Sequence, residues 1–147
     1  MTWKNAPKTA PKDKVGFVYE ITELDTGLKY IGIKKFWKIE KKKPTKYLMK
    51  AGKYVKDKKG KRILNTRKNK ICTKKESNWR DYNSSNPILS EKIPKNPSNY
   101  KKTILRICSS ITELKLHEAY IQLDYYISGN WDMLYNEVIN LRLRARK

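Results

Sequence analysis

Two stretches of alternating residues near the N-terminus constrain the fold of this chain most. Residues 15–22 (VGFVYEIT) and 29–33 (KYIGI) are rich in β-branched and aromatic side chains, which is typical of strands. Between them, Asp-Thr-Gly at 25–27 favours a tight turn. The sequence therefore predicts a β-hairpin with Tyr19 on the first strand and Tyr30 on the second.

Further along the chain, the pattern predicts two helices and one more strand. Asn-Pro at 86–87 is typical of a helix start, and we expect that helix to end near Ile93. Residues 103–108 (TILRIC) form a predicted strand. Ser-Ile-Thr-Glu at 110–113 has the spacing of a capping box and opens a second helix that runs to about Ile127. These elements predict an α+β fold, in which a small antiparallel three-stranded sheet is flanked by helices.

The charge of the chain points to a polyanionic partner. Its 147 residues carry 35 Lys and Arg against 14 Asp and Glu, a formal net charge of +21. This charge argues against an ordinary enzyme of small metabolites, and nucleic acid is the first candidate partner. An acidic membrane surface is the second, although no apolar run approaches the ~20 residues of a membrane span. Because a secretory signal is also missing, we expect a cytoplasmic protein, in a bacterial host if it is phage encoded.

The distribution of charge predicts the domain organisation. Residues 1–14 read as a loose basic arm, 15–140 as one domain and 141–147 as a basic tail. Within the domain, residues 38–76 hold seventeen Lys or Arg against three acids. This segment has too few apolar residues for a core of its own, so we interpret it as an insertion. Inside it, residues 52–65 predict a second, solvated hairpin.

We expect basic side chains of the insertion, and of the residues next to it, to bind the phosphates of the DNA backbone. Each phosphate that a basic side chain neutralises releases counterions, so binding should weaken steeply with salt. The alternative is a solvated basic surface without defined contacts. The candidate DNA-binding residues are Lys35, Lys53, Lys56, Lys58, Lys59, Lys61, Arg62 and Arg67.

Glu118 is the most informative residue of the second predicted helix. At about 100° per residue it shares a stripe with four apolar or aromatic residues: Ile111, Leu114, Ile121 and Tyr125. A carboxylate on a core-facing stripe is costly unless a metal, a cation or strong donors compensate it. The alternative is that Glu118 pairs with a lysine at the edge of the core. A second apolar stripe predicts that this helix is contacted on two sides: Leu116, Tyr120, Leu123 and Ile127.

The hairpin resembles the two-part signature of the GIY-YIG nuclease superfamily. Phe-Val-Tyr at 17–19 stands in place of Gly-Ile-Tyr and keeps the tyrosine, and Tyr-Ile-Gly at 30–32 matches the second half. A basic residue, a helix start, a strand, a helix with a glutamate and a late asparagine follow in the family's order. The resemblance covers about residues 15–140 and is closest to phage-type members, through YIGIKKFW at 30–37 and WRDYNSS at 79–85.

The resemblance implies a metal-dependent endonuclease that hydrolyses phosphodiester bonds in double-stranded DNA. Tyr19 and Tyr30 would stand near the scissile phosphate, and Tyr19 would act as general base or position the attacking water. Glu118 would hold one divalent ion, Mg²⁺ or Mn²⁺, which stabilises the leaving oxygen. The two tyrosine hydroxyls and the Glu118 carboxylate should therefore converge. Asn136 resembles the late asparagine that braces the site; its alternative reading is a turn residue.

The sequence departs from the family after the second half of the signature. Many members carry Arg-x-x-x-His on the next helix, and no such pair follows Gly32 closely. The nearest counterparts are Arg80 and Tyr82, or Asn78 and Tyr82. Arg80 is our candidate for the cation that clamps the phosphate, with Lys34 as a second, and Tyr82 could take part in proton transfer in place of the histidine.

Several biological settings suit such an enzyme: a phage or mobile-element homing endonuclease, a restriction enzyme, or a phage enzyme that degrades host or rival DNA. Any specificity must come from the insertion, the arms or a homodimer of this chain. A non-catalytic nucleic-acid-binding protein explains the charge equally well, and the missing Arg-x-x-x-His leaves an inactive nuclease fold open. The family order of the tyrosines, glutamate and asparagine favours the nuclease.

Overall fold

The structure is a computed structural model that describes residues 2–41, 47–64 and 72–137. Arg67 and the predicted tail at 141–147 lie outside the described residues. The chain divides into two compact units, one formed by Met1–Phe36 with Ser77–Lys147 and the other by Trp37–Glu76. The candidate catalytic residues all belong to the first unit, and most of the candidate DNA-binding residues belong to the second.

A three-stranded antiparallel sheet forms the centre of the first unit, as predicted. Its strand order is β2-β1-β7, with β1 at Gly16–Glu23, β2 at Lys29–Lys35 and β7 at Tyr100–Cys108. The hairpin between β1 and β2 closes through Gly27, whose φ of 73° suits glycine. The third strand begins three residues earlier than the apolar pattern indicates, because Tyr100 pairs with Glu23 at the far end of β1.

Both predicted helices of the first unit are present. Helix α1, Pro87–Lys95, begins at Asn86, whose side chain accepts hydrogen bonds from the backbone N–H groups of the first turn. Helix α2, Ile111–Ile127, begins with the predicted cap, in which the Ser110 hydroxyl accepts from the N–H of Glu113. The carboxylate of Glu113 reaches back to the N–H of Ser109, one residue before the usual partner. The α+β fold class is therefore confirmed.

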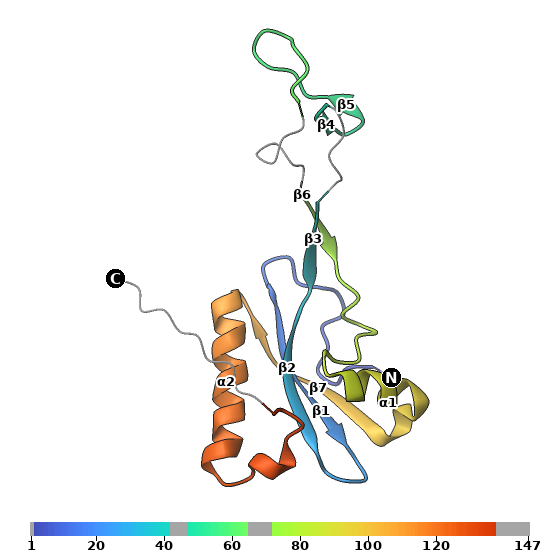
Figure 1. Cartoon of the computed structure of the whole chain (residues 1–147), viewed down its shortest axis with the longest axis vertical. Coiled ribbons are helices and arrows are strands. Elements are labelled where there is room, and N and C mark those ends of the chain that lie inside the picture. Colours follow the sequence, from blue (N-terminus) through green and yellow to red (C-terminus); the bar gives the residue numbers. More distant parts are fainter. Residues whose placement is uncertain (1, 42–46, 65–71, 138–147) are drawn as a thin grey trace, which may run out of the picture. The chain divides into compact units, whose positions relative to one another are not determined.

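The two faces of the sheet carry different cores. Figure 1 shows α2 along one side of the sheet and α1 on the opposite side. Val18 and Ile31 pack with Leu114 of α2 on the first face. Because side chains alternate along a strand, Phe17 and Tyr19 project from the other face. There they join a buried aromatic cluster with Trp3, Phe36 and Trp79, which we call the aromatic face.

The prediction that α2 is contacted on two sides is wrong. Tyr120 and Ile127, from the second apolar stripe, are 69% and 83% exposed, and Leu116 is also exposed. Helix α2 packs against one face of the three-stranded sheet. The stripe that contains Leu114 makes this contact. Three of the four residues of the second stripe face solvent in the described part of the chain, and Leu123 is half-buried.

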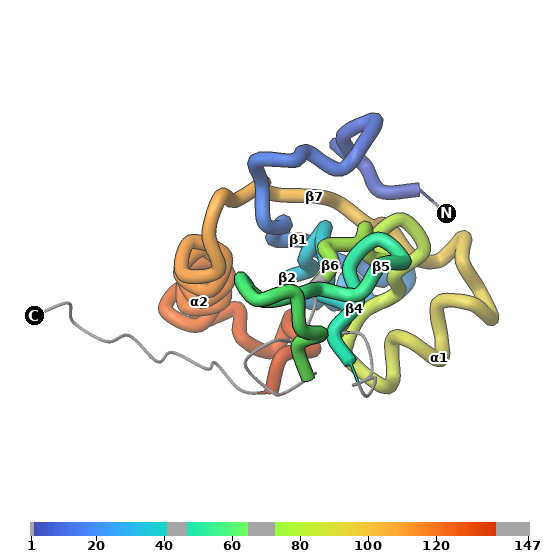
Figure 2. Tube along the Cα trace, turned by 90° about the horizontal axis from the view of Figure 1, so that it is seen from above, coloured from blue at the N-terminus to red at the C-terminus, as the bar shows by residue number. Residues whose placement is uncertain are grey.

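The expectation of a loose N-terminal arm is also wrong. Trp3 is 5% exposed, and its indole N–H donates to the carbonyl of Trp79 at 2.8 Å. The backbone of Lys4 bonds to β7 through the carbonyl of Lys102 and the N–H of Ile104. The segment thus runs beside β7 (Figure 2). The large apolar area of one buried indole outweighs the surrounding prolines and lysines.

The second unit contains short antiparallel pairs. Strand β3, Trp37–Lys41, pairs with β6, Cys72–Glu76, and β4, Met49–Lys50, pairs with β5, Lys53–Tyr54. The predicted solvated hairpin is present, since a bridge joins Lys56 to Arg62 across its loop. None of the described helices in either unit has the length and apolar character needed to cross a membrane.

Candidate active site

Tyr19 and Tyr30 meet above Gly32. The register of β1 and β2 sets Tyr19 opposite Gly32, and Tyr30 lies two residues earlier on the same face of β2. A Cβ added to Gly32 would lie 2.6 Å from the hydroxyl oxygen of Tyr19 and 2.9 Å from Cε1 of Tyr30. The two ring centroids are 6.1 Å apart. The absence of a side chain at Gly32 therefore leaves space for the rings of both tyrosines over the edge strand β2.

The hydroxyl of Tyr19 is buried without a hydrogen bond. Trp3 and Tyr82 pack against its ring, with centroids at 5.1 and 6.1 Å. Its oxygen makes no hydrogen bond of good geometry with the described residues, although the hydroxyls of Ser84 and Tyr82 lie close enough to act on it. Burial raises the pKa of Tyr19 well above its ordinary value, Tyr82 and Tyr30 raise it further, and the Ser84 hydroxyl opposes the rise. Tyr19 is therefore a neutral phenol at physiological pH, able to donate a hydrogen bond.

A β-bulge lies beside Tyr19. Along β1, Val18 pairs with Arg106 and Tyr19 pairs with Ile104, so the pairing with β7 shifts by one residue between them. Bulges twist a strand locally, and they are common next to active sites, where they re-aim a side chain. The sequence shows no glycine or proline at this point of β7, and the bulge could not be predicted from it.

The loop before α1 completes the surroundings of the two tyrosines. The Ser85 hydroxyl lies 3.0 Å from the Tyr30 hydroxyl. Ser84 is buried and has a φ of 113°, a conformation that non-glycine residues adopt at a cost of about 1–3 kcal/mol. The hydroxyl of Ser84 accepts from the N–H of Asn86, the residue that caps α1. Strain of this kind is common at functional sites.

Lys102 holds this loop from inside the protein. The side chain is buried, with 2% exposed, and its ammonium lies 4.7 Å from the ring centroid of Trp3. It donates to the carbonyl of Tyr82 at 2.7 Å and to the side chain of Asn83 at 3.1 Å. Burial lowers the pKa of Lys102 to about 8. Sequence reasoning missed this residue, because one lysine among so many carries no distinguishing signal.

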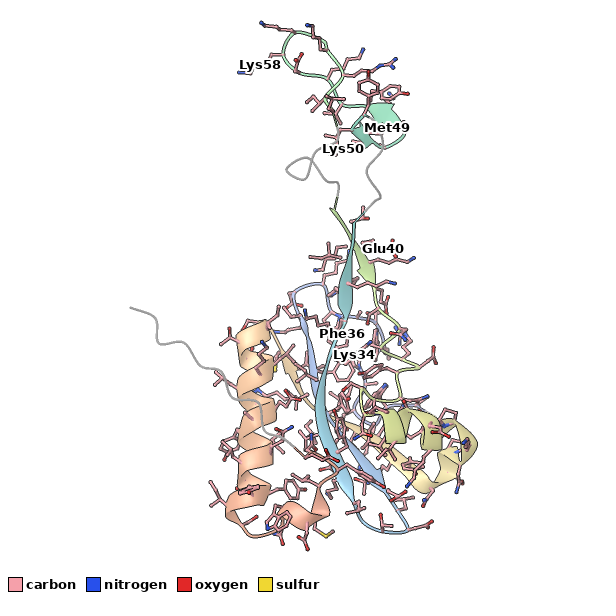
Figure 3. The ribbon with its side chains drawn as sticks, in the orientation of Figure 1. Lys34, Phe36, Glu40, Met49, Lys50 and Lys58 are labelled. Atoms are coloured by element: carbon pink, nitrogen blue, oxygen red, sulfur yellow. The ribbon has the colours of Figure 1, made fainter. Side chains whose placement is uncertain are left out.

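Lys34 is the predicted cation that contacts the tyrosine cluster. Its ammonium lies 3.9 Å from the centroid of the Tyr82 ring and donates to the Asn78 side chain at 2.9 Å. Lys34 projects near the end of β2 (Figure 3). Arg80 instead stacks on Trp79 and donates to the backbone carbonyl of Lys8 at 3.2 Å. These contacts direct Arg80 toward the N-terminal segment, and they bring Asn78 and Tyr82 to Lys34.

Asn136 bonds to β2, the strand that carries the second half of the signature. Its side-chain oxygen accepts from the N–H of Ile31 at 2.9 Å, and its amide donates to the carbonyl of Ile31 at 2.8 Å. Gln122 of α2 donates to the same carbonyl. These bonds use the outer edge of β2, on the side away from β1. Asn136 thereby holds the backbone between Tyr30 and Gly32.

Glu118 lies across β2 from the two tyrosines. Helix α2 packs on the face of Val18 and Ile31, whereas the tyrosines project from the aromatic face. Gln122 reaches the outer edge of β2, and Glu118 is four residues earlier on the same side of α2, about 6 Å along the axis. Glu118 and Tyr19 thus approach the edge strand β2 from its two faces. Their predicted convergence would take place at this edge.

The surroundings of Glu118 suit a cation. The side chain is half-buried, and burial raises its pKa, while Lys115 opposes the rise. Within the described residues, no three His, Cys, Asp or Glu side chains gather as a metal site. A divalent ion at Glu118 would therefore draw most of its oxygen ligands from water and phosphate, as Mg²⁺ commonly does.

The candidate DNA-binding side chains that the structure describes are all exposed. Lys35 ends β2 in the first unit. The others belong to the second unit: Lys53, Lys56, Lys58, Lys59, Lys61 and Arg62. Their exposure is compatible with phosphate contacts, and DNA binding by them stays a prediction.

Comparison with protein families gives a match along most of the chain. Residues 2–139 match the family described as "Putative endonuclease segE, GIY-YIG domain". The matched range includes the complete sheet, both helices and every candidate catalytic residue. Neither the curated proteins nor the solved structures that were compared with the chain match it. The resemblance carried by residues 17–19 and 30–32 is thereby confirmed.

Proposed function

Because this chain belongs to the GIY-YIG endonuclease family, we propose that it hydrolyses phosphodiester bonds in double-stranded DNA at the edge of β2. The observation that carries the proposal is the buried hydroxyl of Tyr19, which has no partner among the described residues and passes over Gly32 beside Tyr30. A buried hydroxyl without a well-formed hydrogen bond is costly, and a role in binding substrate accounts for that cost. The net charge of +21 supports a polyanionic substrate.

Tyr19 acts as a hydrogen-bond donor in this proposal. Its raised pKa argues against the alternative role of general base, because a phenol that keeps its proton at neutral pH is a poor acceptor. A neutral hydroxyl can instead donate to a phosphate oxygen, where negative charge develops in the transition state. Tyr30, paired with the Ser85 hydroxyl, helps to orient the attacking water. Both hydroxyls are held in place before substrate binds, which reduces the cost of ordering them.

Lys34 takes the role of phosphate clamp, in preference to Arg80. Its ammonium already lies over the ring of Tyr82, where a phosphate approaching the tyrosines would meet a positive charge. Tyr82 occupies the place of the family's histidine and hands protons between the site and solvent. Asn136 fixes the peptide of Ile31, and so positions Tyr30 and Gly32 relative to Tyr19.

Glu118 would hold a divalent ion, Mg²⁺ or Mn²⁺. A half-buried carboxylate whose pKa is raised by burial gains from a nearby cation, and a single carboxylate with phosphate oxygens is a common Mg²⁺ environment. When bound, the ion supplies Lewis-acid stabilisation of the leaving oxygen. The setting that we propose is a phage or mobile-element enzyme, which acts in homing, in restriction or in degradation of rival DNA.

Plasmid cleavage tests the proposal. Supercoiled plasmid should become nicked or linear with Mg²⁺ at low salt, and it should stay intact in EDTA. Glu118→Gln should abolish cleavage, whereas Asp124→Asn, an exposed carboxylate on the same helix, should leave it unchanged. Plasmid that stays intact with wild-type protein but is retarded in a gel would instead support a non-catalytic binding protein or an inactive nuclease fold. Cleavage that persists in EDTA would contradict the metal.

A further inference from the structure

The central part of the second unit, residues 47–64, is a small ordered structure built from three short segments. The N–H of Val55 donates to the carbonyl of Leu48, the N–H of Leu48 to that of Ile63, and the N–H of Ile63 to that of Val55. Further pairs join Met49 to Tyr54 and Tyr47 to Leu64. We call this part the tip module. Its backbone is cross-linked by hydrogen bonds although few of its side chains are buried.

In the tip module Arg62 lies over the ring of Tyr54, and Tyr47 lies beside both. The guanidinium carbon lies 3.9 Å from the centroid of the Tyr54 ring and 5.9 Å from that of Tyr47. The two rings meet edge to face, with centroids 6.1 Å apart. Arg62 is exposed, and its guanidinium has no hydrogen bond or ion pair with any described residue. Stacking uses the face of the guanidinium and leaves its N–H groups available at the edge.

The charge of the tip module matches the DNA backbone. Residues 47–64 contain seven Lys or Arg and one acid, Asp57. The Asp57 carboxylate accepts hydrogen bonds from the backbone N–H groups of Lys59 and Lys61, so it shapes the loop. Lys50 on β4 and Lys58 in this loop extend into solvent (Figure 3). These exposed lysines are therefore available to contact phosphates.

We propose that the tip module reads the sequence of double-stranded DNA, with Arg62 donating to a guanine in the major groove; this inference rests on the proposed function. The lysines of the tip module already supply positive charge for phosphates, and Arg62 is the one cation of residues 47–64 with a planar guanidinium. A bidentate contact to O6 and N7 of guanine needs a planar fork in one orientation. The two tyrosines provide that orientation before binding, which lowers the entropy lost on contact. The module thus supplies target preference to a chain whose catalytic unit contacts the backbone.

The experiment selects bound duplexes from a randomised pool with the full chain in EDTA, so that binding is read without cleavage. Wild-type protein should enrich sequences with guanine at one or two positions. Arg62→Lys keeps the charge but removes the planar guanidinium and its parallel N–H donors. It should reduce the preference for guanine about tenfold or more, while the average affinity for DNA changes little. Lys58→Gln is the matched control: it should weaken all sequences alike and reduce the salt slope by about one.

A second pair of variants separates the stacking from folding. Tyr54→Phe keeps an aromatic ring under Arg62 and should keep the preferred sequence, whereas Tyr54→Ala should lose it. Three results would each overturn the inference. They are a selected pool without any enriched sequence, an unchanged guanine preference in Arg62→Lys, and stronger binding to RNA duplexes than to DNA duplexes. The plasmid assay is independent of these results. Cleavage without sequence preference would reject the tip module as a reader, and binding preference without cleavage would reject the proposed function.

Discussion

Gly32 lies directly beneath the hydroxyl of Tyr19, on the neighbouring strand, with no room for a side chain between them. A Cβ at this position would approach the Tyr19 oxygen to 2.6 Å and its Cζ to 2.7 Å. The ring of Tyr19 is rigid and fully buried, so it has little freedom to move aside. The last residue of the signature at 30–32 is therefore required by the packing of the tyrosine on the first strand.

Replacing Gly32 by alanine should affect both stability and activity. We expect Gly32→Ala to lower the free energy of unfolding by about 1–3 kcal/mol through overpacking, and to reduce plasmid nicking more than tenfold because Tyr19 is displaced. Urea denaturation and nicking rates measure the two effects. In Gly32→Ala/Tyr19→Phe, loss of the clashing hydroxyl should restore part of the stability but none of the activity. Normal nicking by Gly32→Ala would show that the position of Tyr19 is unimportant.

Tyr19→Phe should reduce nicking activity without reducing stability. The substitution removes a buried hydroxyl that has no partner among the described residues, so stability should stay equal or rise by up to about 1 kcal/mol. Plasmid nicking should fall by about 10²–10³, the usual effect of losing one preorganised donor. Thermal unfolding and nicking assays measure both quantities. Tyr120→Phe, an exposed tyrosine on α2, serves as the control and should change neither. A clearly destabilised Tyr19→Phe would mean that the hydroxyl has a structural partner.

Glu23 should make stability depend on acid pH. The hydroxyl of Thr26 and then those of Tyr135 and Tyr100 donate to its buried carboxylate, and they lower its pKa from 4.5 to about 2. A lowered carboxyl pKa stabilises the fold above pH 4.5, and this contribution is lost as the pH falls toward about 2. The shift corresponds to about 3 kcal/mol.

The measurement compares wild type with Glu23→Gln by urea denaturation at several pH values. The variant should be less stable at pH 7, by about 2–3 kcal/mol, and the difference should shrink steadily below pH 4.5. Glu91→Gln, an exposed carboxylate in α1, should behave like wild type. A difference that stays constant from pH 7 to pH 3 would contradict the lowered pKa of Glu23.

Lys102 should make stability depend on alkaline pH, with the same sign as Glu23 shows in acid. Burial lowers its pKa from 10.5 to about 8, so the unfolded chain binds the proton more strongly in that range. Stability should therefore rise between pH 8 and 10.5, by up to about 3 kcal/mol. Lys102→Met should lack this rise, which the difference between the two denaturation profiles isolates from other titrating groups. The same variant should nick plasmid more slowly, because the loop of Tyr82 loses its anchor. Equal pH profiles would argue against a buried ammonium.

Local signals in the sequence predicted most of the elements of the first unit. Alternation over 15–22 and 29–33 identified the hairpin, and the spacing from Ser110 to Glu113 identified the start of α2. These signals succeed because hydrogen bonds within a turn or a cap join residues that are close in sequence. The family signature added the two tyrosines, which the register of β1 and β2 does bring together.

The tertiary structure alone decided which side chains surround those tyrosines. Trp3 and Lys102 join the aromatic face from segments that are about 100 residues apart in sequence, and Lys34 rather than Arg80 contacts Tyr82. These outcomes depend on burial and on pairing between segments that are distant in sequence. There, the burial of one indole or one ammonium decides the local structure, and the average composition of the neighbouring residues does not predict it. The sequence by itself determined the hairpin, the helix caps and the tyrosine signature, because their causes are local. Packing across the sheet decided the loop anchored by Lys102, the bulge beside Tyr19 and the exposed stripe of α2, because those depend on which surfaces can cover one another.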